Sequence, residues 1–393
     1  MISGKFHKAV LTYTTYNRVE LIRGGNDYFE LLKQLINDAQ YTLHLQTYIF
    51  NDDETGKEIA STLINAAKRG VEVYMVADGY ASRKISAEFI NDLKSAGIHF
   101  RWFNPIFKSR YFYFGRRLHH KIVVADALVS LVGGINITDR YNDLEVPAWL
   151  DWALYVNGEI SSTLNKICID IWNKSGWGKR PKKITDVSIA PELPSKKCFI
   201  RARVNDWVRG KNQVSKSYIE MMKEAQHSII IMSSYFLPGL TIKKNLIAAA
   251  KRGVNIKLVV AGISDIQLAK QAEKHMYRWV LKNNIELYEY KKTVLHGKLG
   301  VYDGKWVTAG SYNINNISAY ASIELNLDVL NKPFAKKAET ALLEIIQNDC
   351  VQVTEASFDS GNGIFMLAWQ RICYFIYRVT LYLFTFYFKR QHG

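Results

Sequence analysis

The sequence predicts an α/β protein made of two similar halves, each with a mostly parallel central sheet flanked by helices, followed by a helical tail. Three observations support this prediction. A polar motif occurs twice, the segment Ala-Ala-Lys-Arg-Gly-Val occurs twice, and helical segments alternate with short apolar strands around both copies. At 393 residues, the chain is long enough for two domains with large cores.

The predicted elements follow the same order in both halves: helix, strand, helix, strand, helix, strand and then the motif. An aromatic strand precedes each copy of the repeated segment, which covers Ala66–Val71 and Ala249–Val254. A run rich in β-branched residues follows each copy, at Val71–Val76 and Val254–Val260. Apolar strands that alternate with helices favour layered α/β architecture with parallel strands.

A linker separates the two predicted halves. Residues 176–197 contain three of the seven prolines and a basic run, Lys179–Lys183, which is the composition of a loop. We interpret the basic run as a solvated charged loop rather than as a specific lipid or nucleic-acid contact. The predicted boundaries are a first half at 1–175, the linker, a second half at 198–350 and a tail at 351–393.

The predicted tail contains an aromatic segment, Ile364–Phe388, that is long enough to cross a bilayer as a helix. Arg371 and Arg378 lie within it, and each charge at a bilayer centre costs about 2.5–3.5 kcal/mol. The two arginines are one heptad apart, so they share a stripe of the helix and leave a broad aromatic face. An amphipathic helix in the membrane interface is favoured. A helix buried in the protein or an oligomer and a tilted spanning helix are the alternatives.

The composition indicates an anionic partner. The chain carries 52 Lys and Arg against 36 Asp and Glu, a formal net charge of +16, which fits either nucleic acid or an anionic membrane surface. The four cysteines are widely spaced and form no Cys-x-x-Cys pair, so we expect reduced, buried thiols rather than a zinc or dithiol site. The N-terminus has no apolar stretch of the kind that marks a signal peptide.

The repeated polar motif carries the candidate catalytic residues. Its spacing is His-x-Lys, then Asp, then Gly-Gly or Gly-Ser, and then Asn. The first copy consists of His119, Lys121, Asp126, Gly133, Gly134 and Asn136, and the second of His296, Lys298, Asp303, Gly310, Ser311 and Asn313. Side chains two apart in a strand share a face, so each histidine is expected beside its lysine, with His120 turned away as a structural neighbour.

These residue types suit a reaction at a phosphodiester. Two lysines and two asparagines can offset the phosphate charge without a metal. One neutral imidazole can attack phosphorus and form a phosphohistidine, while the other, protonated, donates to the leaving alcohol. Neither copy of the motif is a complete site, so the two halves must meet at a shared active site.

The remaining motif positions have supporting roles. We interpret the two aspartates as buried anchors that accept backbone or cationic hydrogen bonds, and the glycines as places where the backbone passes close to the site. No cofactor is expected. No other group of His, Cys, Asp or Glu has the spacing of a metal site.

The duplicated motif resembles that of the phospholipase D superfamily, and the resemblance extends over most of the chain. It implies two phospholipase D-like halves with an acidic residue downstream of each motif histidine. Asp151 and Glu324 stand at those places, so we expect Asp151 to orient His119 and Glu324 to orient His296. The first half departs from the second by using Asp rather than Glu. By analogy with the superfamily, His119 is the nucleophile and His296 the general acid and base.

Within the superfamily, three segments are similar to bacterial cardiolipin synthases: Tyr48–Gly79, Ser95–Pro105 and Ser233–Gly239. This resemblance implies a phosphatidyltransferase that passes a phosphatidyl group through a phosphohistidine to a second phosphatidylglycerol and releases glycerol. Phospholipid hydrolysis by a phospholipase D-type enzyme, or cleavage of nucleic acid, would use the same site and stays open. The chain resembles the class without N-terminal transmembrane helices, with the tail as the substitute anchor.

A second membrane contact is expected immediately before His119. The segment Phe107–Arg117 interleaves aromatic and basic residues, which suits rings in a membrane interface and arginines on lipid phosphates. A buried edge strand with a solvated turn, or a surface that binds single-stranded nucleic acid, is the alternative. The residues expected to touch lipid are Tyr111, Phe112, Arg116, Arg117, Arg371 and Arg378.

These interpretations lead to a set of expected partners. We expect phospholipid substrates and an anionic phospholipid membrane, and we do not favour nucleic acid. The expected location is the cytoplasmic face of the cell membrane, with peripheral attachment through the tail. The sequence leaves the oligomeric state open.

Overall fold

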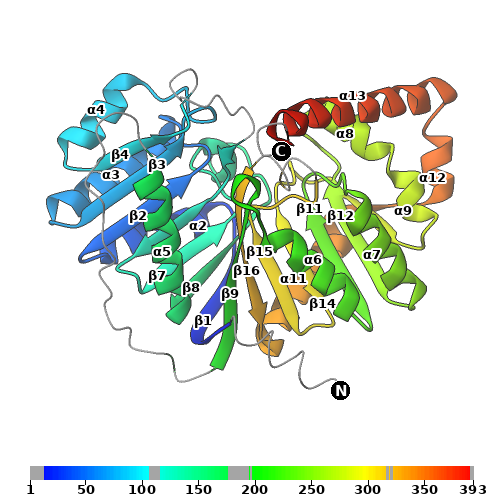
Figure 1. The fold of residues 1–393 in the computed structure, drawn as a ribbon, viewed down its shortest axis with the longest axis horizontal. Coiled ribbons are helices and arrows are strands. Elements are labelled where there is room, and N and C mark those ends of the chain that lie inside the picture. The colour runs from blue at the N-terminus through cyan, green and yellow to red at the C-terminus, as the bar shows by residue number, and fades with distance from the viewer. Residues whose placement is uncertain are drawn as a thin grey trace.

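The computed structural model of the chain describes residues 13–105, 116–175, 194, 197–315, 318 and 322–389, and for residues 381–389 it describes the helical backbone. Most of the predicted linker and the Tyr111 and Phe112 positions lie outside the described residues. Two α/β halves lie side by side, with β1 and β9 adjacent where they join (Figure 1). The predicted two-half α/β architecture is confirmed.

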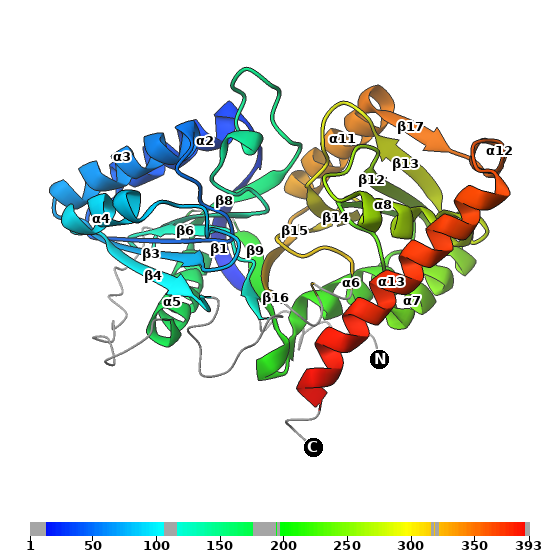
Figure 2. The ribbon, with the colours of Figure 1, turned by 90° about the horizontal axis from the view of Figure 1, so that it is seen from above.

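The first half contains a central sheet with helices on both faces (Figure 2). Its elements in chain order are β1 (Thr14–Arg23), α2 (Asn26–Asp38), β2 (Thr42–Thr47), α3 (Glu54–Lys68), β3 (Glu72–Asp78), α4 (Ala87–Ser95), β4 (His99–Phe103), β5 (Arg117–Leu118), β6 (Ile122–Ala125), β7 (Val129–Gly133), β8 (Trp152–Gly158) and α5 (Glu159–Lys174).

The second half repeats this order and then extends it. Its elements are β9 (Lys197–Asp206), β10 (Lys211–Asn212), α6 (Gln213–Glu224), β11 (Ser228–Ser233), α7 (Leu240–Lys251), β12 (Asn255–Ala261), α8 (Gln267–Lys274), α9 (Tyr277–Leu281), β13 (Glu286–Tyr290), β14 (Lys298–Tyr302), β15 (Trp306–Gly310), β16 (Ser322–Leu330), α11 (Lys332–Asp349), β17 (Cys350–Val353), α12 (Glu355–Ser360) and α13 (Ile364–Lys389).

The repeated Ala-Ala-Lys-Arg-Gly-Val segment ends α3 and α7 in the same way. Gly70 and Gly253 adopt φ angles of 96° and 85°, which are open to glycine at little steric cost. The amide of the following valine then donates back to Ala66 in the first half and to Ala249 in the second. This Schellman-type ending turns the chain directly from the helix into the next buried strand, which explains why the segment is repeated.

The sheet is mixed rather than mostly parallel. Parallel pairing is confined to β2–β3–β4 and β11–β12–β13, apart from the short β5–β16 pair. Strands β6, β7 and β8, like β14, β15 and β16, form antiparallel meanders. The reason is that only a short turn joins β6 to β7 or β14 to β15, whereas a parallel pair needs a long crossover connection.

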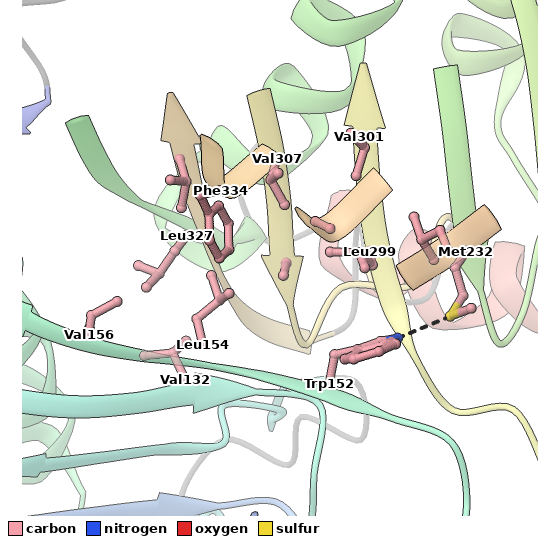
Figure 3. Close-up of a cluster of buried hydrophobic side chains, with 14 of the residues drawn as sticks. Val132, Trp152, Leu154, Val156, Met232, Leu299, Val301, Val307, Leu327 and Phe334 are labelled. Atoms are coloured by element: carbon pink, nitrogen blue, oxygen red, sulfur yellow. Dashed lines mark hydrogen bonds between the residues drawn. The ribbon is translucent and has the colours of Figure 1, made fainter. Parts of the chain in front are cut away.

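The largest apolar core lies between the two halves. Val132, Trp152 and Leu154 of the first half face Met232, Leu299 and other apolar side chains of the second (Figure 3). Trp152 and Leu154 belong to β8, and the Trp152 indole nitrogen lies 3.4 Å from the Met232 sulfur. A second core lies beneath α2 and α3, and a third lies beneath α6 and α7. Because the inter-half core contains β8 and β14, it fixes the two motif regions relative to each other.

The chain continues past the second half as part of the same body. Strand β17 pairs antiparallel with β13, and Phe358 of α12 is buried in the third core. Helix α13 then crosses the second half alongside α8 (Figure 2). Cys373 and Tyr377 of α13 are buried against Leu237, Ala272 and Met276. In the described part of the chain, no helix has the length and apolar character needed to cross a bilayer.

Candidate active site

Short strand pairings between the halves position both motif histidines. Strand β5 pairs with the start of β16, and the amide of His119 donates to the carbonyl of Ile323 at 3.0 Å. Reciprocally, the amide of His296 donates to the carbonyl of Leu150 at 2.8 Å. Each histidine is therefore hydrogen-bonded through its backbone to the residue that precedes an acidic side chain in the other half.

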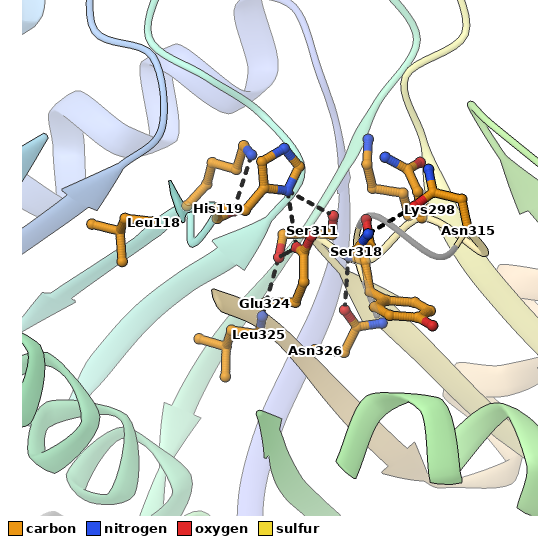
Figure 4. A network of polar contacts seen from close by, with 12 residues as sticks. Leu118, His119, Lys298, Ser311, Asn315, Ser318, Glu324, Leu325 and Asn326 are labelled. Atoms are coloured by element: carbon orange, nitrogen blue, oxygen red, sulfur yellow. Dashed lines mark hydrogen bonds and ion pairs between the residues drawn. The ribbon is translucent and has the colours of Figure 1, made fainter. Parts of the chain in front are cut away.

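The acidic residues cross between the halves. Glu324 Oε2 lies 2.9 Å from His119 Nδ1, and Asp151 Oδ2 lies 2.6 Å from His296 Nδ1 (Figure 4 shows the first pair). We expected the opposite assignment, Asp151 with His119 and Glu324 with His296, and that pairing is wrong. The physical reason is that Asp151 and Glu324 lie near the starts of β8 and β16. The start of each of these strands contacts the motif histidine of the other half rather than that of its own half.

The hydrogen bonds to the carboxylates define the chemistry of the rings. A carboxylate only accepts, so Nδ1 of each ring carries the proton and Nε2 is left with a lone pair. Burial lowers the pKa of His119, although Glu324 opposes the shift. Burial and neighbouring Lys298 lower the pKa of His296 to about 4. Before a phosphate anion enters, both imidazoles are therefore neutral.

The motif lysines lie beside the histidines. Lys121 Nζ donates to the carbonyl of His119 at 3.0 Å, and Lys298 Nζ donates to the carbonyl of His296. Burial lowers the pKa of Lys121 to about 7 and also lowers the pKa of Lys298. An incoming phosphodiester anion would stabilise the ammonium form of both lysines, so substrate charge and lysine charge are coupled.

The motif aspartates anchor the backbone at a distance from the chemistry. Asp126 accepts the amides of Gln40, Tyr41 and Thr42, and Asp303 accepts the amides of the three equivalent residues, Gln226, His227 and Ser228. Both aspartates have positive φ, 53° and 49°, in the tight turns β6–β7 and β14–β15, a conformation that Asp tolerates. They tie each motif hairpin to the strand beside it.

The motif glycines allow close approach of the backbone. A Cβ on Gly134 would lie 2.4 Å from a carboxylate oxygen of Asp151. Cβ atoms on Gly133 and Gly310 would lie 2.4 Å and 2.2 Å from the carbonyls of Trp152 and Leu325. The second copy has Ser311 at the position of Gly134, and its hydroxyl donates to Glu324 Oε2 at 2.5 Å. This serine thus supports the carboxylate that holds His119.

The asparagines line the site and are themselves held in place. Asn136 accepts the amide of Ile49 through Oδ1 and donates to the Tyr141 hydroxyl at 3.0 Å through Nδ2. Asn313 Oδ1 accepts the hydroxyl of Ser234 at 2.5 Å. Fixing the amide oxygen in this way directs the NH₂ group of Asn313 as the available donor toward a ligand.

A pocket of about 500 Å³ contains both histidines. It is lined by both halves and by α13, which contributes Tyr377 and Thr380. The first half supplies Tyr48, Ile49, Asn51, Ala81, Lys84, Arg117, Asn136, Thr138, Arg140, Tyr141 and Trp149, and the second half supplies Tyr235, Leu237, Asp265, Ile266, Ala269, Asn313, Asn315, Ser318 and Ser322. Within the described residues, no group of three His, Cys, Asp or Glu side chains has the geometry of a metal site.

Three aromatic residues of the site were not singled out from the sequence. The Tyr48 ring lies 4.7 Å from the His119 ring, centroid to centroid. Tyr141 and Trp149 flank the His296 ring at 5.3 Å and 6.3 Å. Tyr48 directly follows β2, in the predicted aromatic strand, so the sequence could have predicted that this ring lies at the end of the strand beside the site. The loop that carries Tyr141 and Trp149 has no such periodicity.

The predicted lipid-contacting residues fall into different environments. Arg116 is paired with Asp206 at 2.7 Å and is largely buried, so a direct contact with a membrane phosphate is not supported. Arg117 lies 3.5 Å from Asp78 and lines the pocket. Arg371 and Arg378 are exposed on α13. The described part of the Phe107–Arg117 segment is therefore part of the site wall.

Helix α13 exposes a broad apolar face opposite the side that packs on α8. Phe365 and Phe375 are 89% and 67% exposed, and Trp369 and Ile372 are about half exposed. The two arginines lie along the border between this face and the packed side, as a 100° step per residue requires. The helix thus combines two predicted alternatives: one narrow face is buried in the protein and the other presents apolar side chains to the outside.

Comparison with known proteins agrees with these features. A family model described as "Cardiolipin synthase, PLD-like domain" matches residues 32–152 and 218–346. The chain is 31% identical to cardiolipin synthase B of Salmonella typhi over 350 residues, which is 86% of this chain and 83% of the relative. It is also 31% identical to cardiolipin synthase B of Escherichia coli K12 over 349 residues, with the same coverage of both chains.

Solved structures show the same fold. Phosphatidylserine synthase from Haemophilus influenzae superimposes with a TM-score of 0.76 at 12% identity, over 97% of this chain and 98% of that one. Polyphosphate kinase from Porphyromonas gingivalis gives a TM-score of 0.58 at 14% identity, over 93% of this chain and 53% of that one. At such low identities, these likenesses establish the fold alone.

Proposed function

Because the chain belongs to the family of cardiolipin synthases with phospholipase D-like domains, we propose that it transfers a phosphatidyl group from one phosphatidylglycerol to another and releases glycerol. The single observation that supports this reaction most is the pair of buried histidines, each held at Nδ1 by a carboxylate of the other half. Two such rings in one pocket provide a nucleophile and a general acid for the same phosphodiester.

In the first step, Nε2 of His119 attacks phosphorus of the donor. A bond between nitrogen and phosphorus forms, and the bond from phosphorus to the glycerol oxygen breaks. His296, which gains a proton when the anion enters the pocket, donates it from Nε2 to the departing oxygen. Lys121, Lys298 and the amide of Asn313 offset charge on the non-bridging oxygens. The resemblance to the superfamily assigns the nucleophile to His119.

In the second step, the roles of the rings reverse. Neutral His296 accepts the proton of a free hydroxyl on a second phosphatidylglycerol as that oxygen attacks phosphorus. The nitrogen–phosphorus bond to His119 breaks, which restores the free enzyme and yields cardiolipin. Water in place of the alcohol would give phosphatidic acid, the product of a phospholipase D-type hydrolase. The ratio of these products therefore measures how well the pocket holds the acceptor.

We also propose that α13 attaches the protein to the cytoplasmic face of the membrane as a peripheral helix. Its exposed apolar face supports this role, since full burial of one such side chain is worth about 1.5–3 kcal/mol. Arg371 and Arg378 border that face and can bind lipid phosphates. Tyr377 of the same helix lines the pocket, so the membrane-facing helix also forms part of the route to the histidines.

The proposed function is tested with purified protein and phosphatidylglycerol vesicles. Mass spectrometry should detect cardiolipin and glycerol, with less phosphatidic acid, and activity should survive excess chelator because the pocket supplies its own cations. Quenching with a labelled donor in SDS at mildly alkaline pH, which preserves the acid-labile nitrogen–phosphorus bond, should trap an adduct that is absent from His119→Ala. Phosphatidic acid as the sole product would identify a hydrolase instead. Cleavage of single-stranded nucleic acid with no reaction on lipid would identify a nuclease and contradict the proposal.

A further inference from the structure

The pocket is less symmetric than its catalytic residues. Lys84, Arg117 and Arg140 line it from the first half, whereas the second half contributes a carboxylate, Asp265. The register of the repeated Ala-Ala-Lys-Arg-Gly-Val segment aligns Asp265 with Ser82. The Ser82 hydroxyl is buried and is used by the backbone of its own half, so the repeat does not account for the exposed carboxylate at this position.

Asp265 is held at the pocket by Tyr235. The Tyr235 hydroxyl donates to Asp265 Oδ1, and the tyrosine lies just beyond β11. The corresponding residue of the first half is Ile49, so this pair has no counterpart there. Among the contacts found for the described residues, none involves Asp265 Oδ2, and the residue is exposed. One oxygen is therefore fixed on a residue that lines the pocket, and the second oxygen can accept from a ligand.

Asp265 lines the same pocket as His296. Burial has the largest effect on two neighbouring groups, lowering the pKa of Lys298 and raising the pKa of Tyr141. The negative charge of Asp265 makes a smaller, upward contribution to both pKa values. Lys298 Nζ lies 3.0 Å from His296 Nδ1, and the Tyr141 ring packs on the His296 ring. In the proposed reaction, His296 exchanges its proton with the leaving and incoming alcohol oxygens. Asp265 therefore lines the pocket in which these alcohol oxygens would meet His296.

We propose that Asp265, held by Tyr235, forms an acceptor subsite that binds the free hydroxyl groups of a glycerol headgroup. This inference rests on the proposed transferase function and names the residues that make an alcohol a better acceptor than water. A carboxylate accepts hydrogen bonds from hydroxyls, and the Tyr235 oxygen can accept another. Retaining the alcohol next to His296 favours its attack over that of water, because the bound oxygen reacts as if highly concentrated.

A neutral polyol fits this subsite better than an ammonium headgroup. An ammonium would also gain from Asp265, but Arg117, Arg140 and Lys84 line the same pocket. Repulsion from these cations opposes entry of a further positive charge, whereas a hydroxyl donates to the carboxylate without that cost. The subsite therefore selects glycerol-type acceptors over ethanolamine-type acceptors.

The test separates donor cleavage from acceptor capture. A short-chain phosphatidyl-p-nitrophenol donor carries no polyol, so the p-nitrophenol released in the first turnover, before the adduct breaks down, reports formation of the adduct alone. With glycerol added, the ratio of phosphatidylglycerol to phosphatidic acid reports acceptor capture. Asp265→Ala should lower that ratio about tenfold, the effect of losing one hydrogen bond to a charged group, with p-nitrophenol release unchanged. Asp265→Asn, which can still accept from a hydroxyl, should retain much of the ratio.

Additional variants and a second acceptor distinguish the possible outcomes of this test. Tyr235→Phe should lower the ratio by less than Asp265→Ala, and Asp170→Asn, an exposed carboxylate of α5, serves as the matched control with no effect. An unchanged ratio in Asp265→Ala, or an equal loss of p-nitrophenol release, would overturn the subsite. If added ethanolamine captured the phosphatidyl group but glycerol did not, Asp265 would form an ammonium site. That result would contradict the proposed polyol subsite. Wild-type protein that releases p-nitrophenol but never forms phosphatidylglycerol would contradict the transferase function itself.

Discussion

Glu324 of the second half holds the imidazole of His119 in the first half, with 2.9 Å between Oε2 and Nδ1. The carboxylate is buried, and although burial raises its pKa, His119 and Lys121 hold the pKa of Glu324 below its usual value. The charged carboxylate and the neutral ring are thus stable together. Since Asp151 holds His296 in the same way, neither half contains an ordered catalytic histidine without the other.

The crossed pairing predicts which step each acidic residue supports. Glu324→Gln should slow adduct formation on His119, even with a p-nitrophenol leaving group, by about 10²-fold or more, because the amide misorients the nucleophilic ring. Asp151→Asn should slow the reaction of phosphatidylglycerol but largely spare the first-turnover release of p-nitrophenol, which needs no proton from His296. Rapid-quench measurement of labelled adduct checks both. The reverse pattern would contradict the crossed pairing, or the assignment of His119 as nucleophile.

The low pKa of Lys121 predicts a pH-dependent affinity for phosphodiesters. Burial lowers this pKa to about 7, so the lysine loses its charge as the pH rises through 7. Affinity for short-chain phosphatidylmethanol, which stays a monoanion, should therefore fall above pH 7 by up to about tenfold per pH unit. Titration calorimetry from pH 6 to pH 9 measures this. Lys121→Arg should flatten the profile, and a wild-type affinity that is constant over the range would disprove the coupling.

Buried His120 predicts that the fold weakens in acid. Burial lowers the pKa of His120 to about 4, below the unfolded value of about 6.5. Between these values, the unfolded chain binds a proton that the native protein does not, so the unfolding free energy falls as the pH drops from 6.5 to 4. Each such group contributes up to about 1.4 kcal/mol per pH unit.

The measurement is denaturant unfolding at pH 7 and pH 5 for wild type and His120→Gln. The variant should show a smaller loss of unfolding free energy between the two pH values, because its side chain does not titrate. A variant that is less stable at both pH values but has the same difference between them would show that His120 does not titrate during unfolding.

The exposed face of α13 predicts membrane binding that can be separated from catalysis. Replacing Phe365, Trp369 and Ile372 by Ser should release the protein from anionic vesicles in flotation assays and reduce activity on vesicles about tenfold or more. Activity on monomeric short-chain donor should be kept, because these side chains do not line the pocket. Arg371→Glu with Arg378→Glu should weaken binding more than the Gln pair, since the charge then opposes lipid phosphate.

The matched control replaces two exposed apolar residues outside α13, Leu343 of α11 and Val351 of β17, by Ser. Vesicle binding should be unchanged in this variant. Point substitutions are preferable to deletion of the tail, because Phe358 and Cys373 are buried and Tyr377 lines the pocket, so removing residues 360–393 would also open the site. Full vesicle binding by the Phe365, Trp369 and Ile372 variant would contradict the anchoring role.

Local spacing was sufficient to predict several features. The two-half α/β fold followed from the repeated segment, whose glycines end α3 and α7 in a left-handed conformation that leads the chain into the next strand. The anchoring role of Asp126 and Asp303 followed from their place at the end of an apolar strand. These features depend on the periodicity of apolar residues and on the conformational preferences of single residues, and both can be read from the local sequence.

Strand direction and partner choice depended on the tertiary structure. The expected mostly parallel sheet became mixed because short hairpins at Asp126 and Asp303 reverse the chain. Asp151 and Glu324 were recognised as site residues, but their partners were exchanged. Sequence spacing places a residue along its own strand, whereas its partner is decided by which strand ends abut in the other half.

The sequence by itself determined the duplicated motif, the alternation of helices and strands, and hence the family and the residues proposed to perform the chemistry. The tertiary structure alone decided that the carboxylates cross, that α13 both packs on α8 and lines the pocket, and that Asp265 lines the same pocket as His296. The physical reason is that these contacts join segments far apart in the chain. Their partners are set by the packing of the inter-half core, which no local pattern encodes.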